Sequence, residues 1–328
     1  MKRLIIMSVA LTFLLCISFP VQADRIDKRA DEATNIVVGK IKQVKSFYAT
    51  NKWGDNLIMS EVTLKVDKVH KGDQVEEVTF IVEGGAVGDI VLRVSSVPLF
   101  EEGEALILYL KKKDSRFEYL DSNRFEASGG KAKPSPPSKP PTLPCCKTFA
   151  SWPSQSTVDY YINIDSNTAD DPLDSQPDCA VFDIEAGAGA WYDASGINLD
   201  YLATTTSTTI SELDANVIFF RPPNDNSGST IAVTYTWYYI KGRKIFAFDM
   251  VFYDKWAFFS KICGPTCPTI NYPKGLYLQT IAAHEFGHAI GLDHNRCADS
   301  LMYPYASYCD GYLLSVNDET CAQSLYGN

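Results

Sequence analysis

Residues 282–304 read AAHEFGHAIGLDHNRCADSLMYP, and this stretch decides the fold of the second half of the chain. The 328 residues include only four histidines, and three of them, His284, His288 and His294, fall here. The fourth, His70, stands beside the turn-forming residues 71–73 and is expected to be an exposed residue without a ligand cluster. Grouping a rare residue type in this way indicates a shared chemical task.

The spacing of the three histidines fits a metal centre. His284 and His288 are four residues apart, so on a helix over residues 276–291 both imidazoles lie on one face. Gly291 can take the left-handed backbone conformation that ends a helix, and the resulting turn would bring His294 to the same ion. Three imidazole nitrogens about 2.0–2.1 Å from Zn²⁺ leave a fourth position for water, as in a catalytic zinc site.

Glu285 follows the first histidine and is the expected general base. Its side chain projects beside the ion, where the carboxylate can take a proton from the bound water and pass it to a leaving amine. Two other interpretations are three structural histidines and a true zinc site that has lost its activity. The combined spacing of the histidines, Glu285 and Gly291 favours the catalytic interpretation.

The same residues resemble a known family of peptidases. Residues 284–294, HEFGHAIGLDH, match H-E-x-x-H-x-x-G-x-x-H, the signature of the metzincin zinc peptidases. Residues 300–304, SLMYP, are similar to the Met-turn of that group, with Met302 as the methionine below the metal. Its distance from His294 is typical of the matrixin branch, the matrix-metalloprotease-like peptidases. The similarity spans about residues 148–328.

The resemblance implies an α+β metzincin-like fold, with a twisted sheet over the zinc helix and the site in a cleft beside the Met-turn. By the same resemblance, a peptide would add as a strand to the sheet edge near residues 246–254. Tyr303, Pro304 and Tyr305 are candidates for the substrate pocket. Ala306 stands where matrixins commonly have an aromatic residue, and their Pro-Arg-Cys-Gly latency motif is absent from the sequence.

Composition places the chain among globular proteins. It is 45% apolar and 21% charged, and its length suits two domains. A net charge of −10 without a basic stripe gives no support for nucleic-acid binding. Residues 1–23 have the basic start, apolar run and small final residue of a signal peptide, and the run is short for the alternative, a membrane anchor. We expect an exported protein, extracellular or periplasmic, with no membrane partner after signal removal.

A linker separates two expected domains. Residues 127–144, ASGGKAKPSPPSKPPTLP, cannot bury a core and favour extended conformations. Residues 24–126 contain short runs of alternating apolar and polar residues between glycine turns, which predicts an all-β domain, an OB-like barrel or a small sandwich, that folds separately. Residues 145–328 are expected to be the matrixin-like peptidase domain, and it should end in a helix with a capping box formed by Ser315 and Asp318.

Eight of the nine cysteines lie after residue 144: Cys145, Cys146, Cys179, Cys263, Cys267, Cys297, Cys309 and Cys321. An even number in an exported chain indicates up to four disulfides in the second domain. Cys297 and Cys309 flank Met302, so we predict a bridge between them. Cys145 and Cys146 follow the linker and are expected to bond to later cysteines rather than to hold the metal in a latent state.

The sequence therefore predicts a secreted zinc-dependent endopeptidase that binds one catalytic Zn²⁺ through three histidines and acts on proteins or peptides. The alternative from another class is a secreted binding protein whose zinc peptidase domain is inactive or vestigial. Ca²⁺ is compatible with the acidic stretch 165–178, although no residue in it matches a family calcium ligand, and a solvated loop is the simpler interpretation. The partner of the N-terminal domain is not predicted.

Overall fold

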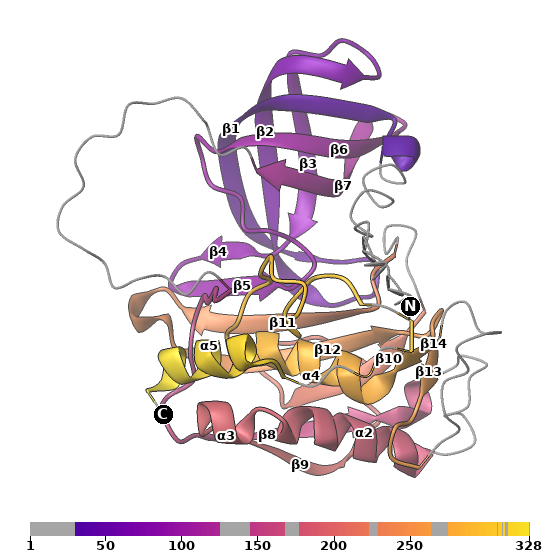
Figure 1. The fold of residues 1–328 in the computed structure, drawn as a ribbon. Helices are drawn as coiled ribbons and strands as arrows, with labels where there is room; N and C mark the ends of the chain where they lie inside the picture. Colours follow the sequence, from indigo (N-terminus) through magenta and orange to yellow (C-terminus); the bar gives the residue numbers. More distant parts are fainter. Residues whose placement is uncertain are drawn as a thin grey trace, which may run out of the picture.

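The structure is a computed structural model that describes residues 30–124, 145–167, 177–222, 229–263, 275–306, 308–309, 311 and 314–327. The expected signal peptide (1–23), the linker (127–144) and most of the acidic stretch 165–178 lie outside these residues. Figure 1 shows a barrel stacked on an open sheet, with the principal helices on the other side of that sheet. Among the described residues, no helix is both long and apolar enough to span a membrane.

The N-terminal strands form a closed barrel, in the order β1-β2-β3-β7-β6. They are β1 (Asn35–Thr50), β2 (Asn56–Lys71), β3 (Glu77–Glu83), β6 (Ala105–Lys113) and β7 (Arg116–Arg124). Alternate residues such as Val62, Leu64 and Leu108 fill its interior, because successive side chains of a strand point to opposite faces. Of the two forms that the sequence predicts, these strands form the barrel.

The second β structure is a seven-stranded sheet of order β4-β5-β11-β12-β10-β8-β9. Its strands are β4 (Gly85–Val87), β5 (Ile90–Val94), β8 (Thr157–Asn163), β9 (Asn198–Thr204), β10 (Asn216–Arg221), β11 (Ala232–Tyr239) and β12 (Ile245–Tyr253). β11 runs antiparallel to both β12 and β5, whereas β12, β10, β8 and β9 pair in parallel.

Strand β12 is an interior strand, which corrects the predicted substrate edge near residues 246–254. It lies between β11 and β10, and eight of its nine residues are buried. Near-continuous burial on both faces is the mark of an interior strand. In the β11–β12 hairpin, β12 pairs with β10 on its other side, whereas β11 pairs with β5.

Helix α4 (Leu278–Ala289) is buried beneath the sheet, with α2 (Pro177–Gly189) packed against it. α3 (Tyr192–Ser195) and α5 (Val316–Tyr326) add to the same apolar core. α5 begins with the predicted capping box, in which the Ser315 hydroxyl accepts from the backbone N–H of Asp318, and it ends at Gly327 in the left-handed conformation. A small parallel pair, β13 (Ala257–Phe259) and β14 (Gly275–Tyr277), and the 3-10 turns η1 (Ile164–Ser166) and η2 (Lys241–Arg243) complete the described elements.

The barrel and the sheet share a second apolar core. Leu57 and Ile58 of β2 pack with Phe219, Trp237 and further residues of the sheet face opposite α4. Strands β4 and β5, which come from the expected N-terminal domain, belong to the peptidase sheet, and the two parts bury apolar surface together. Alternation along a strand predicts a buried face but not the sheet that covers it.

A buried ion pair also joins the two parts. Arg221 of β10 donates to Asp55, in the β1–β2 turn, from Nη1 to Oδ2 at 2.9 Å, and the two side chains are 7% and 2% exposed. The backbone N–H of Ile210 donates to the other carboxylate oxygen at 3.0 Å. Because a buried charge is costly without a partner, this pair fixes the barrel turn on the sheet.

Three disulfides are described: Cys145–Cys297, Cys146–Cys321 and Cys179–Cys263. The prediction that Cys145 and Cys146 bond to later cysteines is confirmed. The predicted bridge between Cys297 and Cys309 is wrong, since Cys297 bonds to Cys145, although Cys309 is itself disulfide-bonded. Proximity in the sequence misled here, because Cys297 bonds to a cysteine that lies 152 residues earlier in the chain.

Candidate metal centre

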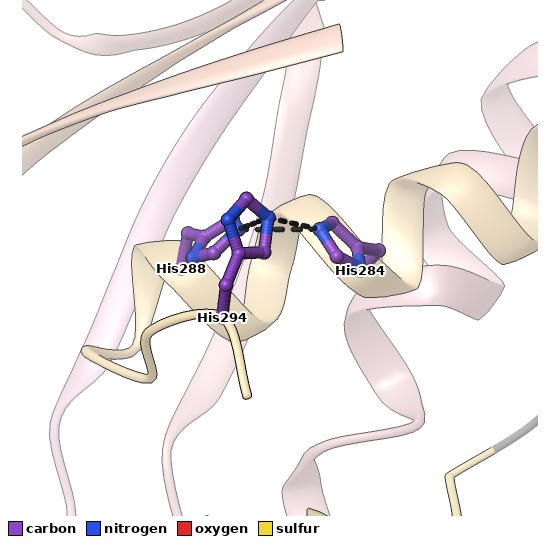
Figure 2. A group of neighbouring side chains, drawn as sticks. All are labelled: His284, His288 and His294. Atoms are coloured by element: carbon purple, nitrogen blue, oxygen red, sulfur yellow. Dashed lines mark hydrogen bonds between the residues drawn. The ribbon is translucent and has the colours of Figure 1, made fainter. Parts of the chain in front are cut away.

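Three imidazoles converge at the C-terminal half of α4 (Figure 2). Nε2 of His284 lies 3.2 Å from Nε2 of His288, and both lie 3.1 Å from Nε2 of His294. Tetrahedral ligands at 2.0–2.1 Å from zinc are separated by about 3.3 Å, so the three nitrogens have the spacing that one ion requires. These residues could hold a metal ion.

The opposite ring nitrogens fix the orientation of two of the imidazoles. Nδ1–H of His284 donates to the backbone carbonyl of Leu301 at 2.6 Å, and Nδ1–H of His288 donates to that of Leu292 at 2.8 Å. A proton on Nδ1 leaves the lone pair of Nε2 free for a metal. Carbonyl partners of this kind are usual behind metal-bound histidines, so the donor set fits Zn²⁺.

Burial favours the neutral, metal-binding form of His288 and His294. Burial, with the neighbouring His284 adding to it, lowers the pKa of His288 to about 3. Burial likewise lowers the pKa of His294 well below its ordinary value, and the other two histidines contribute. A neutral imidazole is the ligand form. His70, in contrast, lies exposed on β2, as predicted.

Gly291 makes the turn between the second and third histidines. Its φ is +100°, a conformation that L side chains rarely adopt, and a Cβ placed there would lie 1.9 Å from the carbonyl oxygen of Ala150. Glycine is therefore required for both backbone conformation and space. The turn reverses the chain after α4, and His294 then points back at the helix, as the sequence predicts.

Glu285 lies beside the histidines in a closed environment. It is 4% exposed, and burial raises the pKa of its carboxyl group, against the lowering effect of His284. The hydroxyl of Thr234 in β11 donates to Oε2 at 2.6 Å, and that of Ser95 donates to the same oxygen at 3.4 Å. Both hydroxyls orient the carboxylate, and Ser95 comes from the N-terminal part of the chain.

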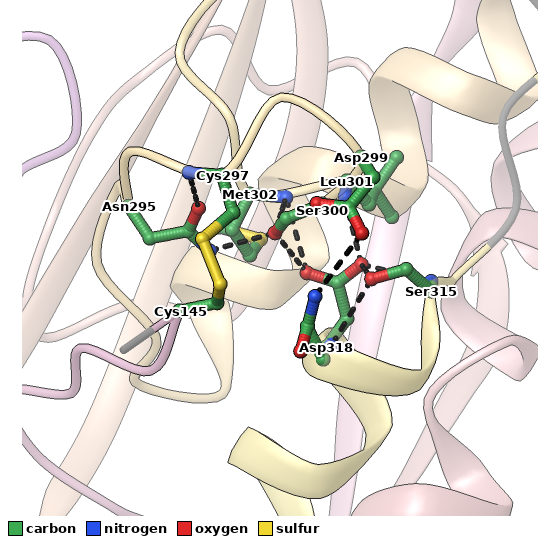
Figure 3. The surroundings of a disulfide bond; sticks show 10 residues. Cys145, Asn295, Cys297, Asp299, Ser300, Leu301, Met302, Ser315 and Asp318 are labelled. Carbon is green, nitrogen blue, oxygen red and sulfur yellow. Dashed lines mark hydrogen bonds between the residues drawn. A yellow bond between two sulfur atoms is a disulfide. The ribbon is translucent and has the colours of Figure 1, made fainter. Parts of the chain in front are cut away.

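Met302 lies under the site, in a loop that α5 holds (Figure 3). It is fully buried, and a Cβ on Gly287 would lie 2.3 Å from its sulfur, so helix and loop are in tight contact. The carboxylate of Asp318 accepts from the backbone N–H groups of Leu301 at 2.7 Å and Met302 at 3.3 Å. The loop that carries Met302 is thus fixed by hydrogen bonds to α5.

The predicted pocket residues follow this loop. Tyr303, Pro304 and Tyr305 are half-buried, and the two tyrosine rings pack edge to face with centroids 5.2 Å apart. Ala306 is exposed. The aromatic pair lies directly after Met302 in the chain, and it remains our candidate for one wall of a substrate pocket.

Sequence reasoning missed four residues around the site: Arg93, Ser95, Thr234 and Asp293. Arg93 donates from Nη2 to Oδ1 of Asp293 at 2.8 Å, and the neighbouring Lys147 lies 2.8 Å from Oδ2. Burial alone would raise the pKa of Asp293, but the two cations hold it well below its usual range. Asp293 precedes His294 and could have been noticed, whereas nothing local marks Arg93 or Ser95, some 200 residues away in the chain.

These features define a class of protein. A core helix carries His284, Glu285 and His288, and a glycine turn leads to His294. The helix and a buried methionine lie beneath a mostly parallel sheet, in which β11 and β4 run opposite to the other strands. This is the arrangement of a metzincin-like metalloprotease domain, in which three imidazoles and a carboxylate meet at one point.

Comparison with known proteins supports a matrixin-like domain. The family model for matrixins matches residues 194–327. Matrix metalloproteinase-9 of Canis lupus familiaris is 44% identical to this chain over 73 residues, which are 22% of this chain and 9% of that protein. The chain thus matches a small part of that relative's length. Residues 194–327 form a matrixin-like metalloprotease domain.

Proposed function

We propose that the protein is a secreted zinc-dependent endopeptidase. The observation that carries this proposal is the meeting of three Nε2 atoms within 3.2 Å of one another, beside the carboxylate of Glu285, inside the matrixin match. His284, His288 and His294 would hold the ion. The pKa values of His288 and His294 are lowered, and Nδ1 of His284 and of His288 is bound to a carbonyl, which supports a metal site rather than a structural cluster.

Glu285 is the proton carrier in this proposal. When bound, Zn²⁺ supplies Lewis-acid chemistry that polarises a carbonyl oxygen and makes a water molecule more acidic. Oε2 of Glu285 takes the proton of the attacking water and returns it to the amine nitrogen of the departing peptide. Burial favours the protonated carboxyl group, so Glu285 can both accept the proton and hold it until the amine leaves.

The hydroxyl of Thr234 has a positioning role. It donates to Oε2 of Glu285 and lies 3.1 Å from the backbone carbonyl oxygen of the same residue. The carboxylate is thereby held in one rotamer. Tyr303, Pro304 and Tyr305 are proposed to contact the substrate residue after the cleaved bond, because they follow the buried Met302 on the same loop.

Export is part of the proposal. Residues 1–23, although outside the described structure, have the pattern of a signal peptide. The three described disulfides agree with an oxidising compartment. The substrates are proteins or peptides, and the division of the chain at residues 127–144 stays a proposal.

The test uses the purified full-length protein. Its metal content is measured by mass spectrometry, and it is incubated with a library of fluorogenic peptides, then with a zinc chelator, then with zinc restored. We expect one zinc per chain and cleavage that the chelator abolishes and zinc restores. A protein that binds no zinc, or cleavage that survives full removal of the metal, would refute the proposal.

A further inference from the structure

The outer edge of β11 is already occupied by a strand of the same chain. β5 pairs with it antiparallel, from Ile90 opposite Tyr239 to Val94 opposite Tyr235. The pairing continues past the strand, since the backbone N–H of Ser95 donates to the carbonyl of Thr234 at 3.0 Å. The β4–β5 hairpin therefore takes the place of any further strand on this edge.

This edge runs alongside the candidate catalytic helix. The hydroxyl of Thr234 contacts both the carboxylate and the backbone carbonyl of Glu285, and the hydroxyl of Thr236 donates to the carbonyl of His288 at 3.3 Å. An extended peptide that paired with β11 would therefore lie against the general base and a metal ligand. Strand addition to an exposed edge gives such a peptide its main-chain hydrogen bonds.

Two side chains of the bound segment point into the site. Ser95 places its hydroxyl 3.4 Å from Oε2 of Glu285, and that hydroxyl also accepts from the backbone N–H of Thr234 at 3.0 Å. Two residues earlier, Arg93 donates to Asp293, the residue before His294, and to the carbonyl oxygen of Val97. Arg93 is 8% exposed, so its side chain lies buried beside the residue that precedes His294.

The alternate side chains hold the hairpin in place. Leu92 and Val94 are buried in the apolar core that the barrel shares with the sheet, together with Leu57 and Ile58 of β2. One face of β5 thus belongs to the barrel contact and the other to the catalytic site. Displacing β5 requires breaking the pairing with β11 and exposing part of this core.

We propose that β5 and the residues that follow it, residues 90–97, occupy the substrate edge as an internal competitor and keep the peptidase latent. The inference rests on the proposed function and adds its regulation. Peptides reach Glu285 only when the β4–β5 hairpin leaves β11. The strength of the ion pair between Arg93 and Asp293 sets how often the hairpin leaves. The mechanism needs no cysteine ligand to the metal.

The test weakens the ion pair between Arg93 and Asp293 in the full-length chain. Arg93→Glu places a carboxylate against Asp293 and should expel the segment, while Arg93→Ala removes the ion pair and leaves Lys147 to neutralise Asp293. Arg116→Glu makes the same charge change on the exposed surface of the barrel and is the matched control. Thermal unfolding and near-ultraviolet circular dichroism identify any variant that has lost its fold. If Arg93→Glu does not fold, Arg93→Ala is compared with the wild type instead.

Three readouts separate latency from catalysis. Hydrogen exchange of the amides of β11 reports whether β5 has left; the affinity for a zinc-binding peptide hydroxamate reports access to the site; peptide hydrolysis reports turnover. We expect both Arg93 variants to exchange faster in β11, to bind the hydroxamate more tightly and to raise kcat/KM by at least about tenfold, with Arg93→Glu above Arg93→Ala. Arg116→Glu should match the wild type.

Tighter hydroxamate binding without hydrolysis in any variant would support the internal competitor and refute the proposed catalysis. Equal hydroxamate affinity and equal hydrolysis in the wild type and both Arg93 variants would overturn the inference, whatever the exchange rates. As a further arm, a peptide copying residues 88–97, GDIVLRVSSV, should inhibit the opened Arg93→Glu variant, and a scrambled peptide should not.

Discussion

Asp318 and the candidate zinc ligand His284 are joined through a single residue, Leu301. The backbone N–H of Leu301 donates to the carboxylate of Asp318 at 2.7 Å, and the carbonyl of the same residue accepts from Nδ1–H of His284 at 2.6 Å. The first helical turn of α5 therefore orients an imidazole on α4. The same carboxylate also accepts from the backbone N–H of Ser315 at 2.9 Å. The side chain of Asp318 therefore both caps α5 and supports the candidate metal centre.

Asp318→Asn should weaken both the fold and the metal centre. Asparagine keeps the size but replaces one acceptor oxygen by a donor, which then faces N–H or O–H groups in a fully buried place. We expect a loss of about 1–3 kcal/mol in the free energy of unfolding and about tenfold weaker zinc binding. Denaturant unfolding and competition with a chelator measure the two. Asp299→Asn, an exposed residue on the same loop, is the control and should change neither.

Glu285→Ala should abolish hydrolysis and leave the zinc in place. The imidazoles are untouched and only the proton carrier is removed, so kcat/KM should fall by about 10²–10⁴-fold. The measurement is made in the wild-type and Arg93→Glu backgrounds, with the metal content determined for each. Glu61→Ala, on the exposed surface of β2, is the control. Hydrolysis at the parental rate with bound zinc would show that Glu285 is not the general base.

Gly291→Ala should destabilise the peptidase part. A left-handed residue other than glycine costs about 1–2 kcal/mol, and the Cβ would in addition collide with the carbonyl oxygen of Ala150. We expect a loss above about 2 kcal/mol and weaker zinc binding, since the turn places His294. Gly189→Ala is the matched control, because nothing lies within 4 Å of a Cβ at that position. Similar unfolding curves for the two variants would contradict the role given to the turn.

Asp55→Asn should loosen the barrel from the sheet. It leaves the buried guanidinium of Arg221 without its charged partner, which typically costs about 3–5 kcal/mol. Asp73→Asn removes an ion pair with Lys112 in which the carboxylate is 71% exposed, and such pairs contribute about 0–1 kcal/mol. Denaturant unfolding compares the two variants. Equal losses would mean that the Asp55 pair does not secure the barrel contact.

Peptide mapping under non-reducing conditions should recover Cys145 linked to Cys297 and Cys146 linked to Cys321. In the double variant Cys145→Ser/Cys297→Ser, the Cys146–Cys321 bridge stays intact. The bridge that is lost therefore closes only a short loop, which runs from residue 297 to residue 321. The chain-entropy model gives roughly 3 kcal/mol for that loop. Unfolding without reductant measures the loss, and a Cys297–Cys309 peptide in the wild type would contradict the structure.

The cluster of three imidazoles could be predicted because its signal is local. His284, His288 and Gly291 lie within eight residues, and helical periodicity with one left-handed glycine fixes where their side chains and backbone go. The start of α5 was predictable for the same reason, since Ser315 and Asp318 are three residues apart. Each of these features depends on chain geometry over one or two turns.

The sequence by itself determined the helix, the cluster of imidazoles and the strand character of residues 90–94, where apolar Leu92 and Val94 alternate with Arg93. Only the tertiary structure decided that this strand joins the peptidase sheet, that Cys297 bonds to Cys145, and that Arg93 reaches Asp293. The physical reason is that strand pairing and disulfides join segments far apart in the chain. Alternation specifies which face of a strand is buried but not its partner, and eight cysteines allow 105 pairings.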